Sequence, residues 1–191
     1  MRIVSITVVA LMAITAALPA QETRGVSFGI HMLAGGRYDN VRMCVGSPAG
    51  VPGGPIGELY FDVKIPVSER GAVAFSIPLF RPIMFGAAFK MLQLEPLLTY
   101  EHILGGETGT RPVVGGGAGV VFHYGPDYHS SLDERGGSFF SIGPIVHGFA
   151  GLTIGKSNLT SGIRGFFSPL FTLDRPAGMV AGGGVELHYG F

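Results

Sequence analysis

The sequence predicts an all-β fold: an eight-stranded antiparallel up-and-down β-barrel. Apolar and other residues alternate with a period of two along most of the chain, which is the repeat of a strand. Only 14% of the 191 residues are charged, where about 25% is usual, and 32 are glycine. Mean hydropathy is +0.42, yet no segment after residue 20 offers the run of about 18 apolar residues that a membrane helix needs. The pattern contains no helix, so the predicted barrel is transmembrane, with strands that face lipid.

The clearest strand is "ELYFDVKIPV", residues 58–67. Leu59, Phe61 and Val63 alternate there with Tyr60, Asp62 and Lys64, so the two sets point to opposite faces. The same alternation recurs along the chain, and each segment is long enough to cross a bilayer at a tilt. In chain order the expected strands are 26–34, 58–67, 73–79, 90–104, 111–124, 138–154, 159–171 and 182–191.

The connections between these strands alternate in length. "SERG", "GGETGT" and "GKSN" are short turns, whereas 38–57 and 125–137 are long. Short turns at one end and longer loops at the other are typical of membrane barrels. Because an open sheet edge would leave backbone groups without partners in hydrocarbon, the last strand should pair with the first.

The second face of the strands carries the charges, the reverse of a soluble barrel. We expect it to line a filled lumen with structural ion pairs, because an unpaired buried charge is costly. Arg81 is expected to point outward near the rim, and a proton or ion path is the alternative role for the lumen. The predicted charge network is Asp62, Lys64, Glu95, Glu101, Arg111, Arg164, Glu186 and His188, beside His31, His123 and His147. Interior glycines (Gly115, Gly117, Gly119, Gly182, Gly184) should make room for Tyr60, Phe149 and Phe166.

Residues 1–20 have the pattern of a signal peptide. Arg2 precedes an apolar run, and small residues stand before the polar "QETR". The expected domains are therefore a signal peptide over 1–20 and a barrel over 21–191. Cys44 is the single cysteine, which excludes a disulfide framework.

No motif predicts a cofactor, metal or catalytic site. The glycine runs at 115–119 and 181–186 do not follow a strand and open a helix, as a phosphate loop would. The histidines lack metal-ligand spacing. His129 and Ser131 match the His-x-Ser spacing of PagL-like lipid A deacylases, which leaves a lipid A-modifying enzyme as an alternative; solvated loops commonly contain the same residue types.

The signal pattern, the eight amphipathic strands and the ending "VELHYGF" resemble small bacterial outer-membrane β-barrels of the OmpA/OmpX/OmpW-like kind. The resemblance implies an outer-membrane location. It also implies that Tyr189 and Phe191 form the C-terminal signal for the barrel-assembly machinery. The expected partners are then outer-membrane lipid, lipopolysaccharide and that machinery.

The expected function is a non-enzymatic membrane scaffold whose long loops bind a surface ligand or support envelope integrity. A narrow channel for small solutes is a further alternative. The net charge of zero gives no basic field for nucleic acid.

Overall fold

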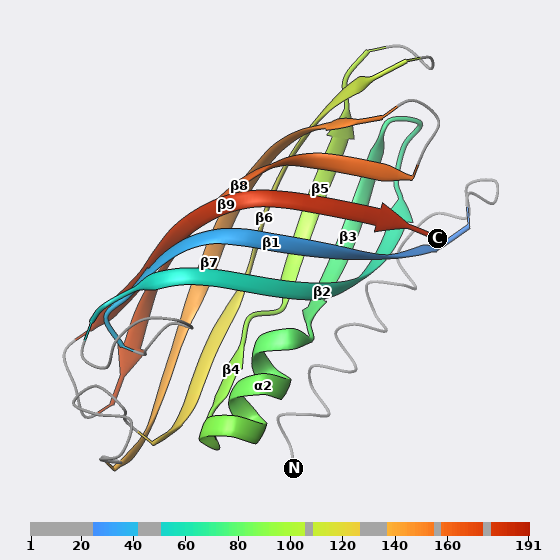
Figure 1. Cartoon of the computed structure of the whole chain (residues 1–191). Helices are drawn as coiled ribbons and strands as arrows, with labels where there is room; N and C mark the ends of the chain where they lie inside the picture. The colour runs from blue at the N-terminus through green and yellow to red at the C-terminus, as the bar shows by residue number, and fades with distance from the viewer. Residues whose placement is uncertain (1–24, 42–50, 106–108, 127–136, 155–157, 174–176) are drawn as a thin grey trace.

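The computed structural model describes residues 25–41, 51–105, 109–126, 137–154, 158–173 and 177–191. They form the predicted closed, up-and-down antiparallel barrel (Figure 1). The expected signal peptide lies outside the described residues. The strands are β1 (Ser27–Asp39), β2 (Gly54–Pro66), β3 (Gly71–Pro78), β4 (Leu92–Leu94), β5 (Leu97–Ile103), β6 (Arg111–Pro126), β7 (Ser138–Thr153), β8 (Leu159–Thr172) and β9 (Gly178–Gly190).

The nine strand segments form an eight-stranded barrel because β4 and β5 occupy the same strand position in the wall. Both pair with β6 in a single register, with Leu94 opposite Phe122 and Leu97 opposite Gly119. Glu95 and Pro96 separate β4 from β5, because proline has no N–H to donate to the neighbouring strand. Pro96 still accepts a backbone hydrogen bond from Val120 at 3.3 Å.

The barrel closes where β1 pairs with β9, as the sequence predicts. The two strands run side by side along the wall in Figure 1. The pairing continues to the last residue, where the Phe191 N–H donates to the carbonyl of Phe28 at 2.9 Å. The C-terminal residues are therefore held by the strand that begins the barrel.

The helix α2 (Phe80–Phe89) is a feature that the sequence did not predict. β3 ends at Pro78, opposite Tyr60, so within the described residues the first half of β2 has no strand partner on this side. α2 packs against β2 and β4 and fills this part of the wall (Figure 1). Pro82 lies in the first turn, where a missing N–H costs little, and Lys90 ends the helix in a left-handed conformation.

The wall is also taller than expected at the loop end, the end that carries the long connections. β1 continues to Asp39 and β2 starts at Gly54, so residues 38–39 and 54–57 belong to strands instead of the predicted loop 38–57. The glycines at positions 35, 36, 54 and 57 interrupted the apolar alternation there and hid the strand pattern.

The outer face is apolar along the strands. Phe28, Leu98 and Ile163 expose 44%, 50% and 65% of their surface, whereas Asp62 between Phe61 and Val63 exposes 5%. Phe28 and Phe61 stack on the wall at 6.0 Å between ring centroids. In the described part of the chain, no helix is long and apolar enough to span a membrane.

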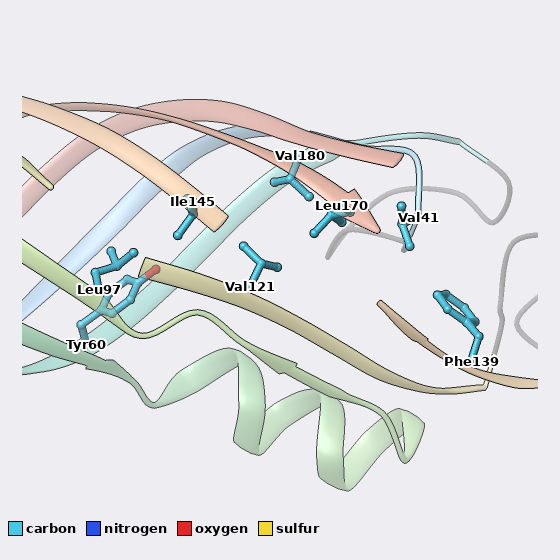
Figure 2. Close-up of a cluster of buried hydrophobic side chains, with 8 residues drawn as sticks. All are labelled: Val41, Tyr60, Leu97, Val121, Phe139, Ile145, Leu170 and Val180. Carbon is cyan, nitrogen blue, oxygen red and sulfur yellow. The ribbon is translucent and has the colours of Figure 1, made fainter. Parts of the chain in front are cut away.

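The loop end of the lumen holds the main cluster of buried apolar side chains. Figure 2 shows them directed into the barrel from opposite walls. Val121, Leu170 and Val180 are completely buried. The full cluster is Val41, Tyr60, Leu97, Val121, Phe139, Ile145, Leu170 and Val180, with Phe166 packed against it. Apolar side chains therefore share this half of the lumen with buried polar ones, such as Asp39 opposite Val180.

Candidate functional site in the barrel lumen

Strand parity places the ionisable side chains inside the barrel, where they form two groups at different heights. The loop-side network consists of Arg37, Asp39, Glu58, Arg81, Gln93, Glu95 and His123. The turn-side cluster, nearer the end with the short turns, consists of His31, Asp62, Arg164, Glu186 and His188.

The loop-side network is organised around Glu95. Its carboxylate accepts from Arg37 Nη1, which lies 2.7 Å from Oε1 and 3.0 Å from Oε2. Oε1 also accepts from Arg81 Nη1 at 3.2 Å. Arg37 also donates to Asp39 through Nη2 at 3.0 Å and Nε at 3.2 Å. Glu58 Oε1 accepts from the backbone N–H of Arg81 at 3.0 Å, which ties α2 to β2.

The network therefore joins the helix to both adjoining strands. Arg81 Nη2 donates in addition to Gln93 Oε1 on β4. Arg81 is 3% exposed, and its guanidinium lies 5.7 Å from the centre of the Phe85 ring. The expectation that Arg81 points outward is wrong, because residues 80–89 form a helix and strand parity does not apply to them.

The turn-side cluster contains two carboxylates, one guanidinium and two imidazoles. His31 Nδ1 donates to the Asp62 carboxylate and lies 2.8 Å from Oδ2 and 3.0 Å from Oδ1. Arg164 Nε donates to Glu186 Oε2 at 2.8 Å, and its Nη2 lies 2.7 Å from Oε1. The His31 ring is stacked between Tyr60 and His188, at 4.3 and 4.7 Å between ring centroids.

At the turn end, a cavity of about 270 Å³ opens from the cluster. Asp62 and His188 line its inner side, and Arg111 lines it from β6. Lys64 and Glu101 form an ion pair at this mouth, with the Lys64 side chain 33% exposed. Polar and apolar groups thus line a space large enough for several water molecules.

The centre of the lumen is filled. The space between Tyr60, Arg164 and Phe166 is only about 10 Å³, at the lower limit for a single water. His147 reaches Thr99 across the interior at 3.3 Å. A Cβ added at Gly182 would stand 2.7 Å from Cζ of Phe166, and one at Gly162 would stand 2.6 Å from Cε2 of Phe149. Glycines in the wall therefore make room for these aromatic rings.

All eight residues of the predicted charge network lie on the lumen side, but they do not form one network. Glu95 belongs to the loop-side network, and Lys64, Glu101 and Arg111 lie at the mouth. The other four, Asp62, Arg164, Glu186 and His188, meet in the turn-side cluster.

The predicted network lacked Arg37, Asp39, Arg81, Gln93 and Glu58, although the alternation had placed Glu58 on the inner face. If the alternation of β1 is continued past Gly35 and Gly36, Arg37 and Asp39 fall on the same face as His31. No comparable signal existed for Arg81.

Two of the remaining predicted residues lie next to the mouth cavity. The side chains of Tyr189 and Phe191 are exposed over 52% and 63% of their surface. His129 and Ser131 fall outside the described residues.

Comparison with known proteins provides little guidance. No protein-family model and no curated protein matches the chain. Among solved structures, the chain is similar to the N-terminal β-barrel domain of Pseudomonas aeruginosa OprF. The match has 11% sequence identity and a TM-score of 0.43, and it covers 87% of this chain and all of that domain. The function must therefore be inferred from the residues of this chain.

Proposed function

We propose that this protein is an integral outer-membrane barrel that acts as a non-enzymatic scaffold, with its long connections at the cell surface. The observation that carries this proposal is the inversion of the barrel. Phe28, Leu98 and Ile163 are exposed on the wall, while Asp62, Glu95 and Glu186 are each 5% exposed or less. In water this arrangement would expose apolar surface and bury charge at a cost. In lipid the apolar wall is favourable, and the lumen keeps the charges out of the hydrocarbon.

The location is tested by fractionating cells that express the chain and by running the extracted protein on a gel before and after boiling. We expect the protein in the outer membrane and a compact, faster-migrating form before boiling. Recovery in the soluble fraction, with the same mobility before and after heating, would contradict the proposal.

A charged residue on the wall gives a second test of the same point. Ile163→Lys places an ammonium group on β8 at a residue that exposes 65% of its surface. In a bilayer this should cost about 2–4 kcal/mol of folding free energy, depending on depth. Ile163→Ala is the matched control. If the lysine variant is as stable as the alanine variant in lipid vesicles, the wall does not face hydrocarbon.

The scaffold role is supported by the filled lumen. A central space of about 10 Å³ does not hold a column of water, so we expect no conductance in planar bilayers. Surface binding through the predicted loops 38–57 and 125–137 is tested by replacing each loop with a short glycine-rich turn. If the loop-replaced barrel keeps every binding phenotype of the intact chain, the loops are not the functional surface.

The expected C-terminal signal belongs to the same proposal. Phe191 is anchored to β1 through its backbone, while its side chain remains exposed and available to an assembly factor. Phe191→Ala should therefore lower the amount of assembled barrel in cells, and refolding of the purified chain in detergent should be little affected.

A further inference from the structure

Four buried nitrogen and oxygen atoms of the turn-side cluster make no hydrogen bond: His31 Nε2, His188 Nε2, Glu186 Oε1 and Arg164 Nη1. Glu186 Oε1 also lies 2.7 Å from Arg164 Nη2, as an ion pair. Buried polar atoms in native proteins are nearly always satisfied, so such atoms call for an explanation. Three of them at one point, on two adjacent strands, indicate a missing common partner.

Their spacing identifies the kind of partner. Glu186 Oε1 lies 3.2 Å from His31 Nε2 and 3.1 Å from His188 Nε2. In a tetrahedral zinc site, with bonds of about 2.0–2.2 Å, neighbouring ligand atoms stand about 3.3–3.5 Å apart. Both separations from Glu186 Oε1 are therefore slightly below the spacing of zinc ligands. Neither contact has the alignment of a full hydrogen bond. One ligand atom each of His31, His188 and Asp62 also lies within 4.8 Å of the others.

The protonation pattern agrees with this interpretation. A carboxylate only accepts, so the contact between His31 Nδ1 and Asp62 places the proton of a neutral His31 ring on Nδ1. Nε2 then carries the lone pair. A carboxylate that fixes the tautomer of a histidine is the usual outer partner of a metal-binding imidazole. Arg164 likewise holds Glu186 in place.

The charge balance of the cluster leaves one negative charge. Asp62 and Glu186 face one guanidinium, Arg164, while the two imidazoles are neutral in the ligand state. The Lys64 ammonium, the next cation toward the mouth, is paired with Glu101. An ion can also reach the cluster, because His188 and Asp62 line the 270 Å³ cavity at the turn end.

We propose that the turn-side cluster is a site for a borderline-soft divalent cation of the zinc type. His31, His188 and Glu186 are the ligands, and Asp62 is the positioning residue behind His31. The inference holds whether or not the outer wall faces lipid. Two imidazoles and one carboxylate are a ligand set that suits zinc better than magnesium or calcium, which prefer oxygen. Pairing of β1 with β9 creates the site, because His31 lies directly opposite His188.

The test uses the untagged full chain, folded in detergent, stripped with a chelator and titrated with Zn²⁺ against a chromophoric competitor. We expect one equivalent to bind. Both His31→Gln and His188→Gln should weaken binding at least tenfold, and Asp62→Asn should weaken it by about 10–100-fold as an outer partner does. His147→Gln removes another buried lumen histidine and should leave binding unchanged; His102→Gln, at a half-buried position, serves if that variant does not fold.

Substitution with Co²⁺ provides a readout that packing alone would not change. The visible spectrum should show tetrahedral coordination, and His188→Gln should abolish it. Absence of zinc binding, or equal binding by the wild type, His31→Gln and His188→Gln, would overturn the proposal. If His31→Gln does not fold, His188→Gln decides the question, because its side chain lies next to the mouth cavity and is 11% exposed.

Discussion

The two halves of the lumen solve the problem of buried charge in different ways. In the loop-side network, Arg37 and Arg81 both reach Glu95, and Asp39 and Glu58 complete the pairing. In the turn-side cluster, a single guanidinium serves Glu186, while Asp62 is bonded to an imidazole. The first half is built mainly from pairs of guanidinium and carboxylate groups, and the second mainly from contacts between imidazole and carboxylate groups.

The surroundings of the two groups also differ: one lies among apolar side chains, and the other lies next to a cavity. The apolar cluster that contains Val121, Leu170 and Val180 (Figure 2) shares the loop half of the lumen with the loop-side network, since Val180 lies opposite Asp39 in the strand register. Below the turn-side cluster lies the cavity of about 270 Å³. Low-dielectric surroundings strengthen both a satisfied ion pair and the penalty for an unsatisfied one. The comparison indicates that one half stabilises the barrel and the other can exchange a ligand.

The largest expected effect follows from removing the centre of the loop-side network. Glu95→Leu leaves the guanidinium groups of Arg37 and Arg81 buried without the carboxylate that joins them. We expect the free energy of unfolding in detergent to fall by about 3–5 kcal/mol, measured by urea titration. Glu95→Gln, which keeps the size and an acceptor, is the matched control and should lose less. A loss below about 1 kcal/mol would show that the network is not stabilising.

Overpacking at the boundary between the halves should have the next largest effect. Gly182 lies opposite Arg37 on β1 and Phe166 on β8. A methyl group there would overlap the carbonyl oxygen of Gly36 and, at 2.7 Å, the Phe166 ring. The centre of the Phe166 ring in turn lies 5.9 Å from Cζ of Arg37. Gly182→Ala should cost about 2 kcal/mol, seen as a lower midpoint of urea unfolding.

Gly148 provides the control for this change, because a Cβ there would meet nothing within 4 Å. Gly148→Ala should change stability by less than about 0.5 kcal/mol. Equal losses in the two variants would mean that backbone freedom, and not steric overlap with the Gly36 carbonyl and the Phe166 ring, decides the result.

Most of the barrel could be predicted from the sequence because each strand contributes a two-residue repeat that needs no knowledge of its neighbours. The residues from Leu59 to Val63 show this most directly, since their alternation gives both the strand and the inward face of Asp62. Closure was predictable as well, because the pattern continues to Phe191 and an open edge is unfavourable in lipid.

The parts that were missed depend on contacts between distant residues. α2 forms where β3 stops short, and Arg81 turns inward because Glu58 and Glu95 lie there. The meeting of His31 and His188 depends on the register between β1 and β9, which residue spacing along the chain does not contain. The sequence therefore predicted which face a residue takes, but not which residues meet.

A smaller effect is expected when the turn-side cluster loses a charge. Asp62→Asn keeps the shape and a hydrogen-bond acceptor for His31, so without added metal we expect a loss of about 1–2 kcal/mol by urea titration. The loss should be smaller than that of Glu95→Leu, because a neutral imidazole is left behind instead of two guanidinium groups. If Asp62→Asn costs as much as Glu95→Leu, the two halves do not differ in the way described.

The smallest effect is expected at the mouth, where Lys64 and Glu101 pair next to the cavity. Exposed ion pairs contribute about 0–1 kcal/mol, and salt screens them. A double-mutant cycle with Lys64→Gln and Glu101→Gln should therefore give an interaction energy of about 0.5 kcal/mol that falls as salt is raised from low concentration to about 1 M. An interaction energy above about 2 kcal/mol that salt does not change would place this pair with the buried loop-side network, since only charges away from water escape screening.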